Sequence, residues 1–269
     1  MFNALFGSAW EIVRKPAVLI PAAVVTAINL VLAFLAMDFI MGFFWNTFMA
    51  GVMPEGSFIE LPYMLFAIYW KELLVTGIVI VLQYALWAWL VFAYTGMKKT
   101  RKESLGEGVA YATSRLGSIL WLSVFVTVLF LAFVLAGMFL LWISTVAGLE
   151  LIGLVLTLLL TVLAAYVSVK LLFVPAAMAA HGLKPKKGMQ QTWRWSAGKL
   201  PGILLFLVLL LLFNGIISVA GDAASALAAG NEIAEVAVLA LFSIIGGAYF
   251  SIALASYYLG TLAKKRKRK

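Results

Sequence analysis

Six long apolar runs divide the chain, and each is long enough to cross a lipid bilayer as a helix. The hydrocarbon core of a bilayer is about 30 Å thick, which a helix crosses in about 20 residues. The runs occupy residues 18–44, 63–94, 117–144, 152–180, 201–220 and 234–261. This pattern predicts an all-α integral membrane protein with six transmembrane helices.

A short segment that mixes aromatic and polar residues precedes the first, third and fifth runs. Residues 4–19, 105–120 and 189–204 align on a basic residue that has an aromatic residue four positions earlier. The three aromatic and basic pairs are Trp10 and Arg14, Tyr111 and Arg115, and Trp195 and Lys199. Apolar and polar positions alternate at roughly helical spacing, which predicts an amphipathic helix on the cytoplasmic side. We expect these six residues to act as interfacial anchors at the lipid head groups.

The alignment predicts an internal repeat of one surface helix followed by two membrane helices. Three such units, at about 1–97, 98–184 and 185–263, would form three hairpins within a single transmembrane domain, followed by a basic tail at 264–269. Pro16, Gly117 and Pro201 follow the basic residues by two positions. Each would let the chain turn into the bilayer, because Pro is tolerated in the first turn of a helix.

The charges of the connections predict the orientation of the chain. Basic residues precede the first run, follow the second and fourth runs, and end the chain. The other connections contain no Lys or Arg, and they hold Glu55, Glu60, Glu150, Asp222, Glu232 and Glu235. Cytoplasmic loops of membrane proteins carry an excess of Lys and Arg. We therefore expect a multi-pass protein of a prokaryotic plasma membrane with both termini in the cytoplasm.

The composition agrees with the bilayer as the main solvent. Hydrophobic residues make up 65% of the 269 residues, and charged residues make up only 12%. The net charge of +9 falls in short cytoplasmic segments, where it would meet anionic lipid head groups, so we do not expect nucleic acid as a partner. The chain has no cysteine, which excludes disulfides, thiolate catalysis and cysteine-ligated metals.

Two stretches resemble a known group of proteins. Residues 173–199 read FVPAAMAAHGLKPKKGMQQTWRWSAGK, and the chain opens with FNALFGSAWEIVRKPAVLIP after Met1. Both stretches resemble uncharacterised prokaryotic integral membrane proteins related to the membrane domain of glycerophosphodiester phosphodiesterases. Thr192 stands where that group has Ser, and Gly198 and Lys199 reverse its Lys-Gly order. The resemblance implies a membrane domain without the phosphodiesterase domain, so it brings no hydrolase residues to this chain.

A few polar residues lie inside the apolar runs, where they are costly unless they are paired or functional. The candidates for a substrate or ion pathway are Glu72, Lys170, Asn29, Gln83 and Asn214. Lys170 could pair with Glu72 inside the bundle, or it could extend to the inner head groups if Pro175 ends its helix early. The three amides could instead form hydrogen bonds between helices.

The remaining polar features favour structural roles. His181 is the only histidine, and a metal site needs three or four converging ligands, so we expect neither a metal nor another cofactor. Small residues around Gly246 and Gly247 suit close packing of the last helix. The tail is a topological anchor or a contact for anionic lipid or an acidic partner, and it consists of Lys264, Lys265, Arg266, Lys267, Arg268 and Lys269.

Three hypotheses for the function remain open. The first is a non-enzymatic membrane protein that handles lipids or hydrophobic small molecules, as a transporter or a permease-like subunit. The second is an accessory or assembly factor that docks a partner membrane protein or another copy of this chain. The third is an intramembrane enzyme, which the single His and the scarcity of carboxylates disfavour. Membrane lipids are the partners that all three share.

Overall fold

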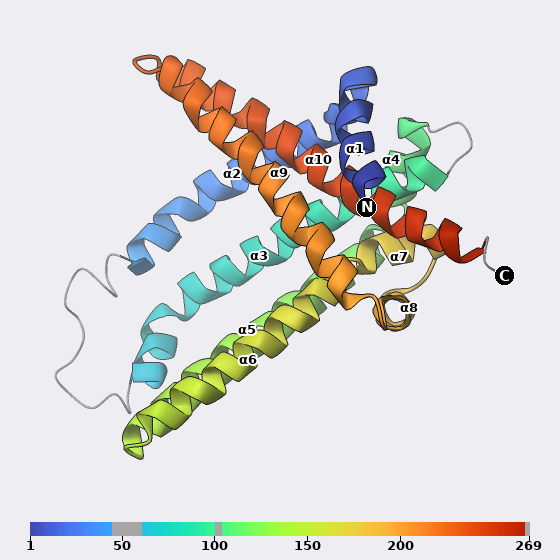
Figure 1. The fold of residues 1–269 in the computed structure, drawn as a ribbon. Helices are drawn as coiled ribbons and strands as arrows, with labels where there is room; N and C mark the ends of the chain where they lie inside the picture. The colour runs from blue at the N-terminus through green and yellow to red at the C-terminus, as the bar shows by residue number, and fades with distance from the viewer. Residues whose placement is uncertain (45–60, 100–103, 267–269) are drawn as a thin grey trace. The chain divides into compact units, whose positions relative to one another are not determined.

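The computed structural model describes residues 1–44, 61–99 and 104–266, and this part of the chain contains helices and no strands (Figure 1). The prediction of an all-α protein is therefore confirmed. The helices are α1 Phe2–Arg14, η1 Pro16–Val18, α2 Leu19–Phe44, α3 Leu61–Lys99, α4 Leu105–Thr113, α5 Leu116–Val146, α6 Glu150–Leu171, α7 Val174–His181, α8 Pro185–Ser196, α9 Leu200–Leu227 and α10 Glu232–Arg266.

Six helical stretches within the described residues are long and apolar enough to cross a membrane. They are Pro16–Phe34, Leu74–Lys99, Leu116–Val146, Glu150–His181, Leu200–Leu227 and Glu232–Ala263. Their mean hydropathies lie between 2.0 and 2.9. Each corresponds to one of the six apolar runs, so the chain has the helices of a multi-pass membrane protein.

The helices depart most from the runs in the fourth and fifth runs. The fourth run is interrupted, because α6 ends at Leu171 and α7 begins at Val174, with Pro175 in its first turn. Proline favours that position because its missing N–H has no helical partner there. The fifth apolar run ends at residue 220, but its helix is longer, so the placement of Asp222 in an outer connection is wrong. Helix α9 continues to Leu227 and includes Asp222.

Short helices form at the three segments that were expected to be surface helices, namely α1, α4 and α8. Helix α4 begins with Ser104, whose side chain accepts a hydrogen bond from the backbone N–H of Glu107. Helix α8 has Pro185 in its first turn. These are common ways to begin a helix, since they satisfy or remove the unpaired N–H groups of the first turn.

The chain divides into two compact units, each formed by separate segments. The first unit comprises Met1–Ile28, Ala85–Ile119 and Val169–Lys269, and the second comprises Asn29–Tyr84 and Leu120–Ser168. In the first unit, α9 packs along α10, α1 packs against α10, and α7 packs against α8. This unit therefore contains all three short helices that the sequence predicts.

Aromatic side chains fill much of the core of the first unit. Phe206 stacks on Tyr257 with ring centroids 4.0 Å apart, and Trp195 lies 4.8 Å from Tyr258. Phe173, just before α7, lies 5.1 Å from Trp195. Aromatic pairs at such distances contribute about 1 kcal/mol each beyond the burial of their surface. The core thus joins α7, α8, α9 and α10 through one aromatic cluster.

In the second unit, most side chains of α5 and α6 are exposed, although the two helices touch at small residues. A Cβ atom placed on Gly137 would lie 3.8 Å from Leu160 and Thr157. Near the other end of this contact, Gly153 lies against the side chain of Ser144. The exposed residues are Leu, Val, Phe and Ile along nearly the whole length of both helices. Such surfaces suit contact with hydrocarbon.

Candidate functional site

The three aligned aromatic and basic pairs adopt the same local geometry in the first unit. The guanidinium carbon of Arg14 lies 5.2 Å from the ring centroid of Trp10, and that of Arg115 lies 5.9 Å from Tyr111. The Nζ atom of Lys199 lies 5.3 Å from the ring of Trp195. A cation within about 6 Å of an aromatic face is attracted by the ring quadrupole. Each pair lies where a short helix gives way to a long one.

The aromatic members of these pairs differ in their exposure. Trp10 is 58% exposed, so its ring is available to surround the protein. Trp195 is only 6% exposed, and its indole N–H donates a hydrogen bond of 2.9 Å to the Thr261 hydroxyl. The Tyr111 hydroxyl donates to the backbone carbonyl of Ala179 at 3.3 Å. Two of the three aromatic residues therefore also connect their short helix to another helix.

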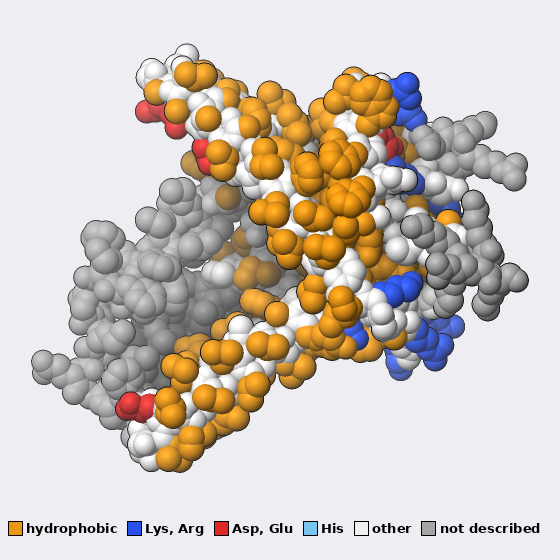
Figure 2. Space-filling model, viewed as in Figure 1, with side chains coloured by type: hydrophobic (Ala, Val, Ile, Leu, Met, Phe, Trp, Pro, Cys, Tyr) orange, Lys and Arg blue, Asp and Glu red, His pale blue; other side chains and the backbone are white. Residues whose placement is uncertain are grey.

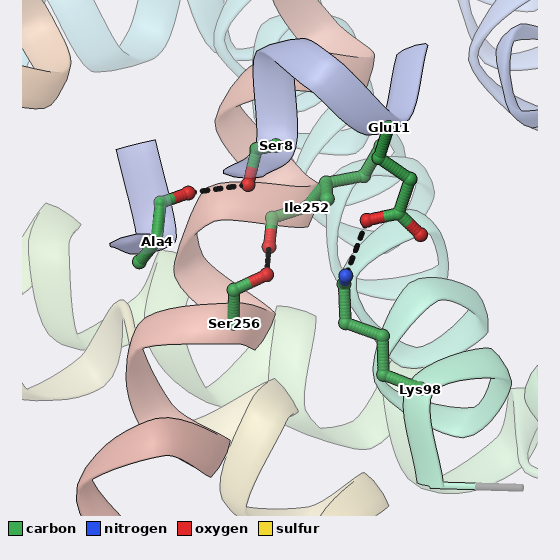
Figure 3. Close-up of polar contacts among 6 residues, drawn as sticks. All are labelled: Ala4, Ser8, Glu11, Lys98, Ile252 and Ser256. Carbon is green, nitrogen blue, oxygen red and sulfur yellow. Dashed lines mark hydrogen bonds and ion pairs between the residues drawn. The ribbon is translucent and has the colours of Figure 1, made fainter. Parts of the chain in front are cut away.

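An ion pair connects helix α1 to α3 (Figure 3). The carboxylate of Glu11 forms an ion pair with the ammonium group of Lys98 in α3, and both side chains are largely buried. Ser8 packs inward and donates a hydrogen bond to the carbonyl of Ala4, one turn earlier in α1. The ion pair was not predicted from the sequence, because its members are 87 residues apart.

Helix α4 contacts α3 backbone to backbone. Gly108 lies so close that a Cβ atom there would collide with the carbonyl oxygen of Ala93 and lie 2.9 Å from the backbone nitrogen of Met97. A Cβ atom on Gly96 would lie 3.3 Å from the Cα atom of Gly108. Only glycine fits at Gly108, so this crossing fixes the position of α4 on α3.

Of the predicted pathway residues, Lys170 and Asn214 belong to the first unit, and Asn29 and Gln83 belong to the second. Lys170 is 6% exposed in the last turn of α6, and its Nζ atom lies 4.5 Å from the ring centroid of Trp193 in α8. This position at a helix C-terminus favours a cation. Gln83 is exposed, whereas the side-chain oxygen of Asn29 is buried. The side chain of Glu72 and those of the basic tail, 264–269, lie outside the described residues.

Asn214 lines a polar cleft between α9 and α10, with a volume of about 320 Å³. Helix α9 contributes Asn214, Ser218 and Asp222, which are four residues apart and so lie on one face. Helix α10 contributes Ser243 and the glycines at 246 and 247. Asn214 was predicted from the sequence as a pathway residue, whereas Ser218, Asp222 and Ser243 were not. The four-residue spacing of Asn214, Ser218 and Asp222 is visible in the sequence.

Close contacts on the two helices border this cleft. A Cβ atom on Gly246 would lie 2.9 Å from the side-chain oxygen of Asn214, and one on Gly221 would lie 2.8 Å from the Cβ atom of Phe242. The Asn214 oxygen is buried, and within the described residues it has no hydrogen-bond partner. An unpaired buried polar atom costs about 1–3 kcal/mol. Asn214 therefore places a buried oxygen without a partner beside the cleft.

The end of the α9 and α10 pair that includes Asp222 is acidic. Glu232 and Glu235 lie in the first turn of α10, just after the segment that joins the two helices. The sequence has no Lys or Arg between Lys199 and Lys264. Figure 2 shows acidic side chains at the joined end of these helices. This end of the helix pair therefore attracts cations, and no basic residue between Lys199 and Lys264 offsets its negative charge.

His181 and the other ionisable residues do not assemble a metal site in the described ranges, where no three His, Asp or Glu side chains converge. The ring of His181 instead lies nearly perpendicular to that of Tyr258, at a centroid distance of 6.3 Å.

Comparisons with protein-family models, with curated proteins and with solved structures find no match for this chain.

Proposed function

We propose that this protein is a non-enzymatic integral membrane protein that handles lipids or hydrophobic small molecules, as a transporter or a permease-like subunit. The observation that carries this proposal is the polar cleft between α9 and α10, whose lining includes Asn214 and Asp222. A cleft of about 320 Å³ has room for roughly ten water molecules or one small polar group. Polar cavities inside membrane helices are costly, so they mark pathways and binding sites.

The surroundings of the cleft also favour an amphiphilic ligand. The neighbouring face of α9 is strongly apolar, and Leu211, Ile216 and Val219 are each at least 60% exposed. A ligand with a polar head and a hydrocarbon part would find a suitable environment for both. This arrangement supports lipid handling.

The same proposal includes a topology. We propose three hairpins with both termini in the cytoplasm of a prokaryote, each hairpin preceded by a short helix at the inner head groups. The three cation and aromatic pairs support this repeat, because Arg14, Arg115 and Lys199 each contact the ring four residues earlier. Their positions suit basic residues that reach lipid phosphates beside aromatic rings at an interface.

The proposed function can be tested by identifying the lipids that co-purify with the protein. We expect wild-type protein in maltoside micelles to retain at least one amphiphile, identified by mass spectrometry, and Gly247→Leu to lose it. Gly247 lines the cleft, and a Cβ atom there would meet no atom within 4 Å, so leucine extends into open space. Gly77→Leu is the matched control, since Gly77 also lies in a membrane helix with open space around its Cβ position.

Retention in the control together with loss in Gly247→Leu would support binding in the cleft. The proposal is overturned if the wild type retains no amphiphile, or if the folded Gly247→Leu protein retains the same amphiphiles as the control. Gel-filtration profiles and helical circular dichroism establish that the compared proteins are folded.

A further inference from the structure

The lining of the cleft between α9 and α10 carries one charged side chain, and that charge is negative. Asp222 supplies the carboxylate, while Asn214, Ser218 and Ser243 supply neutral polar groups. The nearest acidic residues along the chain, Glu232 and Glu235, lie at the same end of the helix pair. From these charges and the polar lining of the cleft, we infer that it binds the ammonium head of an aminolipid or another long-chain amine.

The spacing along α9 sets the shape of the ligand. Asn214 and Asp222 are eight residues apart, which corresponds to about 12 Å along the helix axis. Asp222 lies five residues before the end of α9 at Leu227, whereas Asn214 lies in the middle of the helix. A bound amphiphile would therefore place its ammonium group near Asp222 and a second polar group, such as a hydroxyl or an ester, near Asn214.

Each polar position has a distinct part in this recognition. The Asp222 carboxylate would accept charge-assisted hydrogen bonds from the ammonium group, which are about twice as strong as neutral ones. The Asn214 side chain lines the cleft at the middle of α9, and its amide would form a hydrogen bond with the deeper part of the ligand. Because the one charge on the lining is negative, a carboxylate head would be rejected and an alcohol would bind less tightly than an amine.

The preference for the head group can be tested with three probes that have the same alkyl chain and different head groups. Octadecylamine, octadecanol and octadecanoate are added in equal amounts to the protein in maltoside micelles, whose head groups carry no charge. Native mass spectrometry then counts the bound probes. We expect the wild type to prefer the amine over the alcohol by roughly tenfold, the ratio that corresponds to about 1.4 kcal/mol.

Asp222→Asn should abolish this preference while it leaves binding of the alcohol unchanged, because asparagine keeps the shape of the side chain and removes its charge. Glu232→Gln is the matched control: it also neutralises an acidic residue at this end of the helix pair, but Glu232 does not line the cleft. The control should keep the preference for the amine.

This inference rests on the proposed function, and the experiment separates the two. If none of the three probes binds, both the proposed function and the inference are overturned. If the probes bind but the wild type shows no preference for the amine, the inference alone is overturned. The same holds if Asp222→Asn keeps the preference or if Glu232→Gln removes it to the same extent.

Discussion

The hydroxyl of Tyr94 in α3 donates a hydrogen bond of 2.5 Å to the backbone carbonyl of Val18, 76 residues earlier in the chain. Tyr94 is fully buried, and Val18 is 2% exposed in the short turn that leads into α2. The bond therefore fixes the point where the chain leaves α1 and enters its first long helix. It also shows how the first unit joins segments that are distant in sequence.

Replacing Tyr94 by Phe should destabilise the protein by about 1 kcal/mol, because it removes this buried hydrogen bond and leaves the packing of the ring in place. Unfolding by sodium dodecyl sulfate in mixed micelles measures the change. Tyr249→Phe is the control, since the Tyr249 hydroxyl is buried and has no hydrogen-bond partner in the described part of the chain. That variant should be neutral or slightly more stable, and an equal loss in both variants would contradict the prediction.

The ion pair between Glu11 and Lys98 should connect α1 energetically to α3. Its side chains are 12% and 19% exposed, so water screens their attraction only in part. We expect a coupling free energy of about 1–2 kcal/mol in a double-mutant cycle with Glu11→Gln and Lys98→Met. Unfolding in mixed micelles gives the four stabilities. If the effects of the two substitutions on the free energy of unfolding are additive, the ion pair does not contribute to stability and the prediction is wrong.

Gly108→Ala should destabilise the contact between α4 and α3 by roughly 1–3 kcal/mol, because a Cβ atom there collides with the backbone near Ala93 and Met97. Gly106→Ala tests the same exchange two residues earlier in α4, where the nearest atom would be 3.9 Å away. That variant should be neutral or more stable, since alanine favours helices. Proteolysis within the segment before α4 and the midpoint of unfolding report the difference. Equal stability of the two variants would disprove the tight crossing.

The orientation of the helices can be measured directly, because the chain has no cysteine. Single cysteines are introduced at the exposed positions Lys186, Ala147 and Ala229. An impermeant maleimide should label Ala147→Cys and Ala229→Cys in intact cells, whereas it should reach Lys186→Cys only after the membrane is opened. Labelling of the residue 186 and 229 variants from the same side would contradict the proposed topology.

Much of the secondary structure can be predicted from this sequence, since the apolar runs and the three mixed segments each contain a helix. The fifth apolar run stops at residue 220, so hydropathy alone leaves Asp222 outside the helix. The following residues, 223–227, are mostly alanine, which has the highest helix propensity, and the helix continues through them. This extension is what brings Asp222 onto the same helical face as Asn214.

The contacts between distant segments could not be predicted. The closeness of Gly108 to Ala93 depends on the crossing of two helices, and no local pattern specifies that crossing. Lys170 was expected either to pair with Glu72 or to reach the inner head groups, and in the structure its ammonium group lies over the ring of Trp193. A cation and an aromatic ring have no fixed spacing in sequence, so only the fold reveals that they meet.

Because the aliphatic side chains of α5 and α6 are exposed, contact with lipid should contribute to the stability of these helices. With few neighbours inside the protein, these helices depend on acyl chains to complete their solvation. Short-chain detergents should therefore loosen residues 120–168 at concentrations that leave the aromatic cluster around Trp195 and Tyr258 intact. The choice of amphiphile during extraction would then decide whether the purified material keeps its second unit in a native state.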